Sequence, residues 1–245
     1  MNDAPIIVTG ASRGIGFAVA QGLVSQGSSV VLTARDTSSL DYAFGGMSLV
    51  HLQPWDLAET ESLDAYINTI TEQYGLVGGF VHCAGHNKVI PLHMNKVEDY
   101  EALWRIHALA PMRIVSLLTK KGKSQPGASF VLISSLSAHE GSLGNAAYAA
   151  AKGALEGFLK PAAVELAERQ IRINIVVPGM VRTNMSQNFL KRLSVDQLAQ
   201  VEGSYPLGLG QPEQVAEMIL FLLSDKSSWI TGQKFFLDGG HMSRK

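Results

Sequence analysis

The sequence predicts an α/β fold in which a doubly wound parallel sheet is covered by helices on both faces. Short apolar runs alternate with longer segments of helical periodicity, which is the order of a strand–helix repeat. Most of the runs are continuously apolar rather than alternating, as strands covered on both faces require. No linker or internal repeat interrupts this order, so we expect one domain over residues 1–245.

The elements follow from these runs. Strands are expected at Ile6–Thr9, Ser29–Thr33, Leu49–Leu52, Gly79–Cys83, Ser129–Ser134, Arg172–Val177 and Lys234–Leu237. Helices are expected at Ile15–Gln26, Glu59–Tyr74, Val97–Lys121, Ala146–Gln170 and Pro212–Leu223. Residues 178–209 contain no obvious strand, and loops of that length often cover a site. We therefore expect a substrate lid at about residues 184–209.

Composition excludes several classes of protein. Hydrophobic residues make up 46% and charged residues 17%, which is typical of a globular chain. A net charge of −1 argues against nucleic acid as a partner. The single cysteine, Cys83, cannot form a disulfide within the chain, which favours a reducing compartment. No apolar stretch is long enough to span a membrane, so we expect a cytoplasmic protein without a membrane partner.

A glycine-rich turn follows the first expected strand. Its sequence is Gly10-Ala11-Ser12-Arg13-Gly14-Ile15-Gly16, and a helical pattern begins within it. Gly10 permits a tight turn, while Gly14 and Gly16 let backbone N–H groups approach a pyrophosphate. The spacing is one residue longer than the common dinucleotide fingerprint, and a glycine turn without a ligand is the alternative. The strand before it and the helix after it favour a Rossmann-type dinucleotide site.

Three side chains suggest acid–base chemistry. Tyr148 and Lys152 lie four residues apart on one expected helix and therefore on one face. Ser135 ends an apolar strand, where open α/β sheets place ligands. An ammonium group lowers the pKa of a nearby phenol, and a hydroxyl can hold a substrate oxygen while the tyrosine transfers its proton. The alternative is a solvated contact between Tyr148 and Lys152.

With these motifs in view, the sequence resembles the short-chain dehydrogenase/reductase family over the whole chain. The similarity is to its common single-domain branch, which includes 3-oxoacyl-carrier-protein reductase-like members. The matching positions are Thr9-Gly10-x3-Gly14-x-Gly16, Asp56, Ala84-Gly85, Ser135, Tyr148-x3-Lys152, Asn174, Pro178-Gly179, Thr183 and Asp238-Gly239-Gly240.

The resemblance assigns roles to these residues. It implies that Tyr148 is the general acid/base, that Lys152 lowers its pKa and holds the nicotinamide ribose, and that Ser135 orients the substrate oxygen. The cofactor-binding residues it implies are Gly10, Ser12, Arg13, Gly14, Ile15, Gly16, Arg35, Asp56, Leu57, Cys83, Ala84, Gly85, Tyr148, Lys152, Pro178, Gly179, Val181 and Thr183.

The sequence departs from the family at two positions. Cys83 stands where the family usually has asparagine before Ala84-Gly85. His107 stands at the position of the family's catalytic asparagine, and we expect it to belong to the catalytic set. Pro111 has no N–H and cannot bond to the carbonyl of His107, so we expect the long helix to bend between them. We expect the freed carbonyl to face Lys152.

The cofactor preference follows from the end of the second strand. NAD-preferring relatives carry an acidic residue where this chain has Ala34, and Arg13 and Arg35 lie nearby. Charge-assisted bonds to a 2′-phosphate predict NADP(H) rather than NAD(H). The alternative is that both arginines are solvated surface groups.

Other residues carry weaker predictions. His139, Asn145 and Met185 are the candidate substrate contacts. The histidines around the Cys83 turn, at 82, 86 and 93, have no convergent acidic or cysteine partners, so no metal site is expected. The basic run at residues 120–123 suits a helix C-terminus, and docking of an acidic carrier protein is the alternative.

Together these features predict an NADP(H)-dependent oxidoreductase that transfers a hydride between nicotinamide and a ketone/secondary alcohol pair. The substrate is a 3-oxoacyl thioester, a sugar or a small ketone. Two alternatives stay open: a cofactor-binding sensor or scaffold with weak turnover, and an epimerase or dehydratase that uses the same site. The small residues of the helix at 146–170 permit close helix packing, and the family resemblance implies a homo-oligomer, a tetramer or a dimer.

Overall fold

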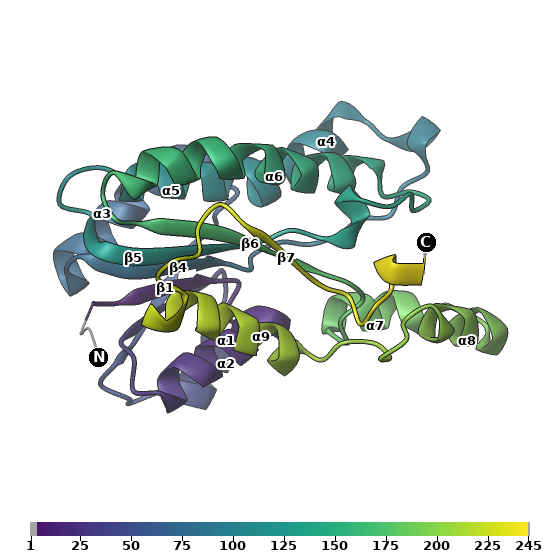
Figure 1. Ribbon diagram of the computed structural model, residues 1–245, viewed down its shortest axis with the longest axis horizontal. Helices are drawn as coiled ribbons and strands as arrows, with labels where there is room; N and C mark the ends of the chain where they lie inside the picture. Colours follow the sequence, from purple (N-terminus) through teal and green to yellow (C-terminus); the bar gives the residue numbers. More distant parts are fainter. Residues whose placement is uncertain (1–3, 245) are drawn as a thin grey trace.

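The computed structural model describes residues 4–244 and contains one parallel sheet (Figure 1). Its strands are ordered β3-β2-β1-β4-β5-β6-β7, and every neighbouring pair is parallel. The doubly wound α/β fold is therefore confirmed. The strands are β1 (Ile6–Thr9), β2 (Val30–Ala34), β3 (Val50–Pro54), β4 (Val77–His82), β5 (Ser124–Ile133), β6 (Arg172–Pro178) and β7 (Lys234–Leu237).

Helices cover both faces of the sheet (Figure 1). Each face has its own hydrophobic cluster, and both clusters take residues from the strands. One cluster includes residues of α1 (Gly14–Ser25), α2 (Ser38–Phe44) and α9 (Pro212–Leu223). The other includes residues of α3 (Leu63–Tyr74), α5 (Ala110–Leu118) and α6 (Ala146–Ala167). Across residues 4–244, no helix combines the length and apolarity needed to cross a membrane.

The chain reverses its direction of winding between β1 and β4, which are neighbours in the sheet. Such switch points place ligands outside the carboxyl ends of the strands. Gly10 follows β1, Cys83 follows β4 and Ser135 lies two residues beyond β5. The fold therefore brings the motifs found in the sequence to one edge of the sheet.

Several boundaries differ from the sequence-based expectation. The helix α2 was not predicted, because only two of its seven residues, Leu40 and Phe44, are buried. Strand β3 extends to Pro54, which the sheet tolerates because β3 is an edge strand. Strand β5 begins at Ser124, where the pairing with β4 shifts register between Val77 and Gly79.

The long helix expected over residues 97–121 is three segments in the structure. α4 (Val97–Trp104) is followed by a π-helical turn at Arg105–Leu109 and then by α5. In this turn the N–H of Ala110 donates to the carbonyl of Arg105, five residues back. Pro111 follows and has no N–H, which prevents a return to regular helical bonding at that point. The helix is interrupted where it was expected to bend.

The segment expected to form a lid contains two short helices, α7 (Asn184–Leu190) and α8 (Val195–Gly203). They lie beyond the carboxyl end of the sheet (Figure 1). Their apolar side chains form a third, small cluster whose buried members are Leu190, Tyr205 and Leu209. This segment thus has packing of its own, separate from the two clusters on the sheet.

A buried polar pair tests how the core is stabilised. The hydroxyls of Thr33 and Tyr66 lie 2.6 Å apart, and both residues are buried. Replacing Tyr66 with Phe leaves the Thr33 hydroxyl without this partner, so we expect urea unfolding to show a loss of about 1–3 kcal/mol. The double variant with Thr33→Val removes both polar groups and should recover most of that loss. Equal stability of the single and double variants would contradict this account.

Candidate active site

The glycine turn brings three backbone segments into close contact. A Cβ atom placed on Gly10 would lie 2.7 Å from the Cα of Ala84, and one on Gly16 would lie 2.3 Å from the carbonyl oxygen of Gly10. Gly10 also has a φ of +64°, which glycine adopts without strain. The turn leads directly into the N-terminus of α1 at Gly14. Exposed backbone N–H groups at a helix N-terminus, with no side chain above them, fit the pyrophosphate of a dinucleotide.

The adjacent strand ends carry the other residues expected to bind adenosine. Arg13 and Arg35 are exposed. The pKa of His86, which follows β4, is lowered mainly by burial and to a smaller extent by the charge of Arg35. The Asp56 carboxylate accepts a hydrogen bond of 3.0 Å from the N–H of Ala58 and is otherwise exposed. Leu57, in contrast, is buried in the core. The structure brings these residues to the same edge as the glycine turn.

Tyr148 and Lys152 project from one face of α6 toward the end of β5. The ammonium of Lys152 is buried and donates a hydrogen bond of 2.6 Å to the carbonyl of Ile133. It lies 5.8 Å from the centre of the Tyr148 ring. Ser135 begins a short turn, and its Oγ accepts from the N–H of Ser137 at 3.2 Å. The Ser135 hydroxyl also lies close enough to the phenol of Tyr148 to lower its pKa, against the larger effect of burial.

Burial dominates the electrostatics of these groups. It raises the pKa of Tyr148 to about 12, against the opposing effect of the Ser135 hydroxyl. The expected lowering of the Tyr148 pKa by Lys152 is not seen, because the ammonium is turned toward Ile133. Burial also lowers the pKa of Lys152 to about 8 and raises that of the Cys83 thiol to about 12. Tyr148 is therefore a protonated phenol at neutral pH.

His107 is buried between the Gly85 turn and Tyr148. Its Nε2 donates to the carbonyl of His86 at 2.6 Å, and its ring lies edge-on to Tyr148 with centroids 4.9 Å apart. A Cβ on Gly85 would lie only 2.1 Å from the Cε1 atom of His107. Burial, followed by the charge of Lys152, holds the pKa of His107 well below its usual range. The imidazole is therefore neutral.

The break in the long helix is tied to the first strand by His82. The carbonyl of Ile106 accepts a hydrogen bond of 3.0 Å from His82 Nε2. Because that nitrogen must donate, Nδ1 accepts, and it lies 3.0 Å from the hydroxyl of Thr9. Burial lowers the pKa of His82 to about 3, so the neutral ring holds this geometry at all ordinary pH values. The sequence did not assign His82 a role, although it directly precedes Cys83.

Glu156 is a second residue that the sequence analysis missed. It lies four residues beyond Lys152 on α6 and accepts hydrogen bonds from Ser134 at 2.5 Å and from Lys234 at 2.8 Å. Its third partner is His139 Nε2, at 2.9 Å. Burial alone would raise the pKa of Glu156, but these bonds outweigh it and lower the pKa. The spacing Tyr148, Lys152, Glu156 was the signal that could have identified it.

The expected substrate contacts lie in different surroundings. The imidazole of His139 is bonded to Glu156 and packs edge-on against Phe236 of β7. Asn145 precedes α6, and its Oδ1 accepts from Asn87 Nδ2 at 3.0 Å. Met185 is exposed on α7. Within residues 4–244, no group of three or more His, Cys, Asp or Glu side chains is arranged to hold a metal ion.

The segment after β6 joins the glycine turn to the lid. A Cβ on Gly14 would lie 3.2 Å from Thr183 Cγ2, and Thr183 Oγ1 caps α7 by accepting from Ser186. Val181 forms an isolated bridge with Gly210, and Pro178 ends β6. Residues 178–183 thus lie beside the turn, as expected for the nicotinamide end of a dinucleotide site.

Comparisons with known proteins agree with this geometry. A family model described as Enoyl-(Acyl carrier protein) reductase matches residues 10–242. Carbonyl reductase family member 4 of Danio rerio is 34% identical over 238 residues, which cover 96% of each chain. The 3-oxoacyl-[acyl-carrier-protein] reductase FabG of Thermotoga maritima is 30% identical over 239 residues, again 96% of each chain.

Solved structures give the same result. A short-chain dehydrogenase/reductase from Brucella melitensis, described as a glucose/ribitol dehydrogenase, superposes with a TM-score of 0.90 at 26% identity and covers 98% of this chain and 97% of its own. The structure of ElxO with NADP bound has a TM-score of 0.88 at 26% identity and covers 99% and 100%.

The fold and the site together define a nicotinamide-dependent oxidoreductase with a Rossmann-type sheet. The chain belongs to the short-chain dehydrogenase/reductase family, and it acts on the ketone and alcohol forms of its substrate.

The charge of Lys152 predicts a pH dependence. Because its pKa is lowered to about 8, the ammonium is present below that pH and is lost as the pH rises through it. We expect kcat/KM for NADPH, which reports on the free enzyme, to fall about tenfold per pH unit above roughly pH 8. In Lys152→Arg the guanidinium stays charged, so the residual activity should show no such fall up to about pH 10. If the fall in kcat/KM above roughly pH 8 persists unchanged in this variant, another group is responsible for it.

Proposed function

We propose that this protein is an NADP(H)-dependent reductase or dehydrogenase with Ser135, Tyr148 and Lys152 as its catalytic set. The observation that carries the proposal is the position of a protonated, half-buried phenol beside a serine hydroxyl, at the sheet edge that also holds the glycine turn. A bound nicotinamide would supply or accept the hydride at the substrate carbonyl carbon.

The chain's own residues handle the substrate oxygen. For carbonyl reduction, Tyr148 donates its phenolic proton to that oxygen while Ser135 donates a hydrogen bond to it. Burial keeps Tyr148 protonated until this transfer, because its pKa is about 12. The buried ammonium of Lys152 binds the ribose hydroxyls, and it lies 5.8 Å from the centre of the Tyr148 ring, from where it can turn toward the phenolate left behind. His107 packs against Tyr148 and acts in this set by fixing the position of the phenol ring.

The preference for NADP(H) rests on the end of β2. Ala34 offers no carboxylate to a ribose 2′-OH, and the nearest acid, Asp36, accepts hydrogen bonds from the N–H and hydroxyl of Ser38 at the start of α2. Arg13 and Arg35 are exposed beside the turn and can form charge-assisted bonds to a 2′-phosphate. The NADP-bound structure of ElxO supports the same preference.

The substrate we propose is a ketone or secondary alcohol with an apolar portion, such as a 3-oxoacyl thioester or a small hydrophobic ketone. Met185 and Phe189 of α7 are 45% and 41% exposed and offer apolar surface on the lid. The 3-oxoacyl and carbonyl reductases among the relatives support this class. A sugar substrate fits this lid less well.

Docking of a carrier protein on the basic run at residues 120–123 is not supported. Lys120 and Lys123 are bonded to Asp64 and Asn68 of α3. The run also precedes β5 and therefore lies at the amino end of the sheet, opposite the site. A carrier-bound substrate would have to approach from the lid side.

The two other functions that the sequence left open are not favoured. An epimerase or dehydratase would use the same site, but the relatives are reductases and dehydrogenases. A sensor with weak turnover rests on His107 alone, whereas the serine, tyrosine and lysine are all in place.

We also propose a homo-oligomer in the cytoplasm. A hollow between α4 and α6 is lined by Tyr100, Glu101, Trp104, Ala147, Ala150 and Ala151, and the Trp104 side chain is 43% exposed there. Small residues on α6 would let a second copy pack closely against this hollow. The lone cysteine favours a reducing compartment.

The central test removes the phenol. Tyr148→Phe should lower kcat for ketone reduction by about 10²–10⁴-fold, because a positioned acid supplies roughly that factor. NADPH affinity should change little, since the ring still packs against His107. Consumption of NADPH over a panel of ketones would measure turnover, and fluorescence titration would measure binding. Near-normal turnover of Tyr148→Phe on the best substrate would disprove the catalytic assignment.

The cofactor preference has its own test. Arg35→Ala should weaken NADPH binding by about 10- to 100-fold, the effect of losing one hydrogen bond to a charged group. NADH lacks the 2′-phosphate, so its affinity should stay nearly unchanged. Titration of both cofactors against wild type and variant measures the difference. Equal losses for the two would exclude Arg35 as the 2′-phosphate ligand.

A further inference from the structure

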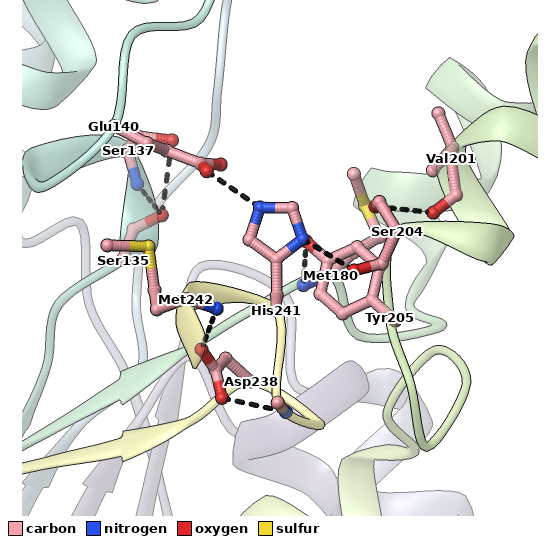
Figure 2. Close-up of polar contacts among 11 residues, drawn as sticks. Ser135, Ser137, Glu140, Met180, Val201, Ser204, Tyr205, Asp238, His241 and Met242 are labelled. Atoms are coloured by element: carbon pink, nitrogen blue, oxygen red, sulfur yellow. Dashed lines mark hydrogen bonds and ion pairs between the residues drawn. The ribbon is translucent and has the colours of Figure 1, made fainter. Parts of the chain in front are cut away.

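His241 joins three parts of the chain that lie far apart in sequence (Figure 2). It follows β7, its Nδ1 lies 3.1 Å from the carbonyl oxygen of Ser204, and its Nε2 lies 2.8 Å from Glu140 Oε2. Its ring stacks on Tyr205 with centroids 4.5 Å apart and an interplanar angle of 23°. Neither His241 nor any of these partners belongs to a motif that the sequence singles out.

Both nitrogens of this imidazole face acceptors. A carbonyl oxygen can only accept, so Nδ1 donates to Ser204. The Glu140 carboxylate also accepts, so Nε2 donates as well. The two side chains are 13% and 18% exposed, which shields the ion pair from solvent screening more than a surface pair.

Glu140 is attached to the turn that carries the catalytic serine. That turn starts at Ser135, and the N–H of Glu140 donates to the carbonyl of Leu136 at 3.0 Å. Within the same turn, the N–H of Ser137 donates to Ser135 Oγ. A displacement of Glu140 would therefore change the position of the Ser135 hydroxyl, because four hydrogen-bonded residues separate the two.

Ser204 and Tyr205 form the end of the lid. Tyr205 belongs to the small lid cluster, its hydroxyl accepts from the N–H of Met180 at 3.1 Å, and its ring lies 2.8 Å from the Cβ position of Gly179. The residue on which His241 stacks thus connects the lid to the segment expected to bind nicotinamide. Met180 of that segment also packs against the lid cluster, so Tyr205 and Met180 make this connection together.

The backbone around His241 is held by Asp238. Its two carboxylate oxygens accept from the N–H groups of Gly240 at 3.0 Å and Met242 at 2.8 Å. The imidazole itself contacts the carbonyl of Ser204, the carboxylate of Glu140 and the ring of Tyr205. The guanidinium of Arg244 lies on the same segment and donates to the carbonyl of Gly203.

We propose that His241 is a positioning residue that couples the Ser135 turn to the end of the lid. This inference rests on the proposed catalytic role of Ser135 and adds a residue that acts through it. Loss of the imidazole removes the bonds from His241 to Glu140 and to Ser204 together. The lid and the serine turn then move independently, and the substrate oxygen is held less firmly.

The first test uses His241→Asn, whose shorter side chain can still donate toward Ser204 but does not reach Glu140. We expect amide hydrogen exchange at residues 136–141 and 198–209 to accelerate about tenfold, the effect of losing one charge-assisted bond. For the best ketone, KM should rise about tenfold with kcat within about threefold, while the Kd for NADPH stays unchanged. The matched control is His51→Asn, which removes another histidine stacked on a tyrosine, Tyr74, far from the site.

The second test separates charge from packing. Glu140→Ala removes the acceptor of Nε2 and leaves the ring of His241 stacked on Tyr205, so exchange of both segments should accelerate as in His241→Asn. In Glu140→Gln the side-chain amide can still bond to Nε2 without the negative charge, so exchange should accelerate less than in Glu140→Ala. This variant also preserves the fold if His241→Asn proves unstable.

The outcomes are distinguishable. Unchanged exchange in His241→Asn, or equal acceleration in His51→Asn, overturns the coupling. Faster exchange with an unchanged KM overturns the positioning role, and unchanged exchange in Glu140→Ala overturns the role of the bond between His241 and Glu140. The exchange measurements need no turnover, so failure of the catalytic assignment through Tyr148→Phe would be seen separately.

Discussion

Three stretches of backbone meet at Gly10, Gly16 and Ala84 at distances that leave no room for a side chain. This contact joins the end of β1 to the first turn of α1 and to the turn after β4. The contact thereby fixes the neighbouring strands β1 and β4 relative to the N-terminus of α1. Every other site residue is placed with respect to this point, because the remaining parallel strands end at the same edge.

The ionisable groups around this point share one physical environment. Burial raises the pKa of Tyr148 and Cys83 and lowers that of Lys152, His82 and His107. In each case the neutral form is favoured, as expected where water is excluded. The site therefore presents hydrogen-bond donors and acceptors rather than fixed charges, with Lys152 poised between its two forms near neutral pH. A pKa near neutral suits Lys152, because it must respond to the charge that develops on Tyr148.

The fold was predictable because its signals are local. Continuous apolar runs identified the parallel strands, and the glycine turn with Ser135, Tyr148 and Lys152 indicated the site edge. Glu156 and His241 were missed because their partners are remote in sequence, 101 residues apart for His241 and Glu140. Nor could the sequence show that the His107 imidazole bonds to the carbonyl of His86, since this depends on how closely the Gly85 turn approaches the helix.

The π-helical turn at Arg105–Leu109 lets α4 and α5 direct their apolar side chains toward two different surfaces. A π turn contains one residue more than an α turn, so the helix beyond it is rotated by about 100° about its axis. Before the turn, Tyr100 and Trp104 face the hollow beside α6; after it, Ile114 and Leu118 are buried against the sheet. The extra residue therefore lets the apolar side chains before and after the turn point in different directions. In an uninterrupted α-helix the same side chains would lie on one face.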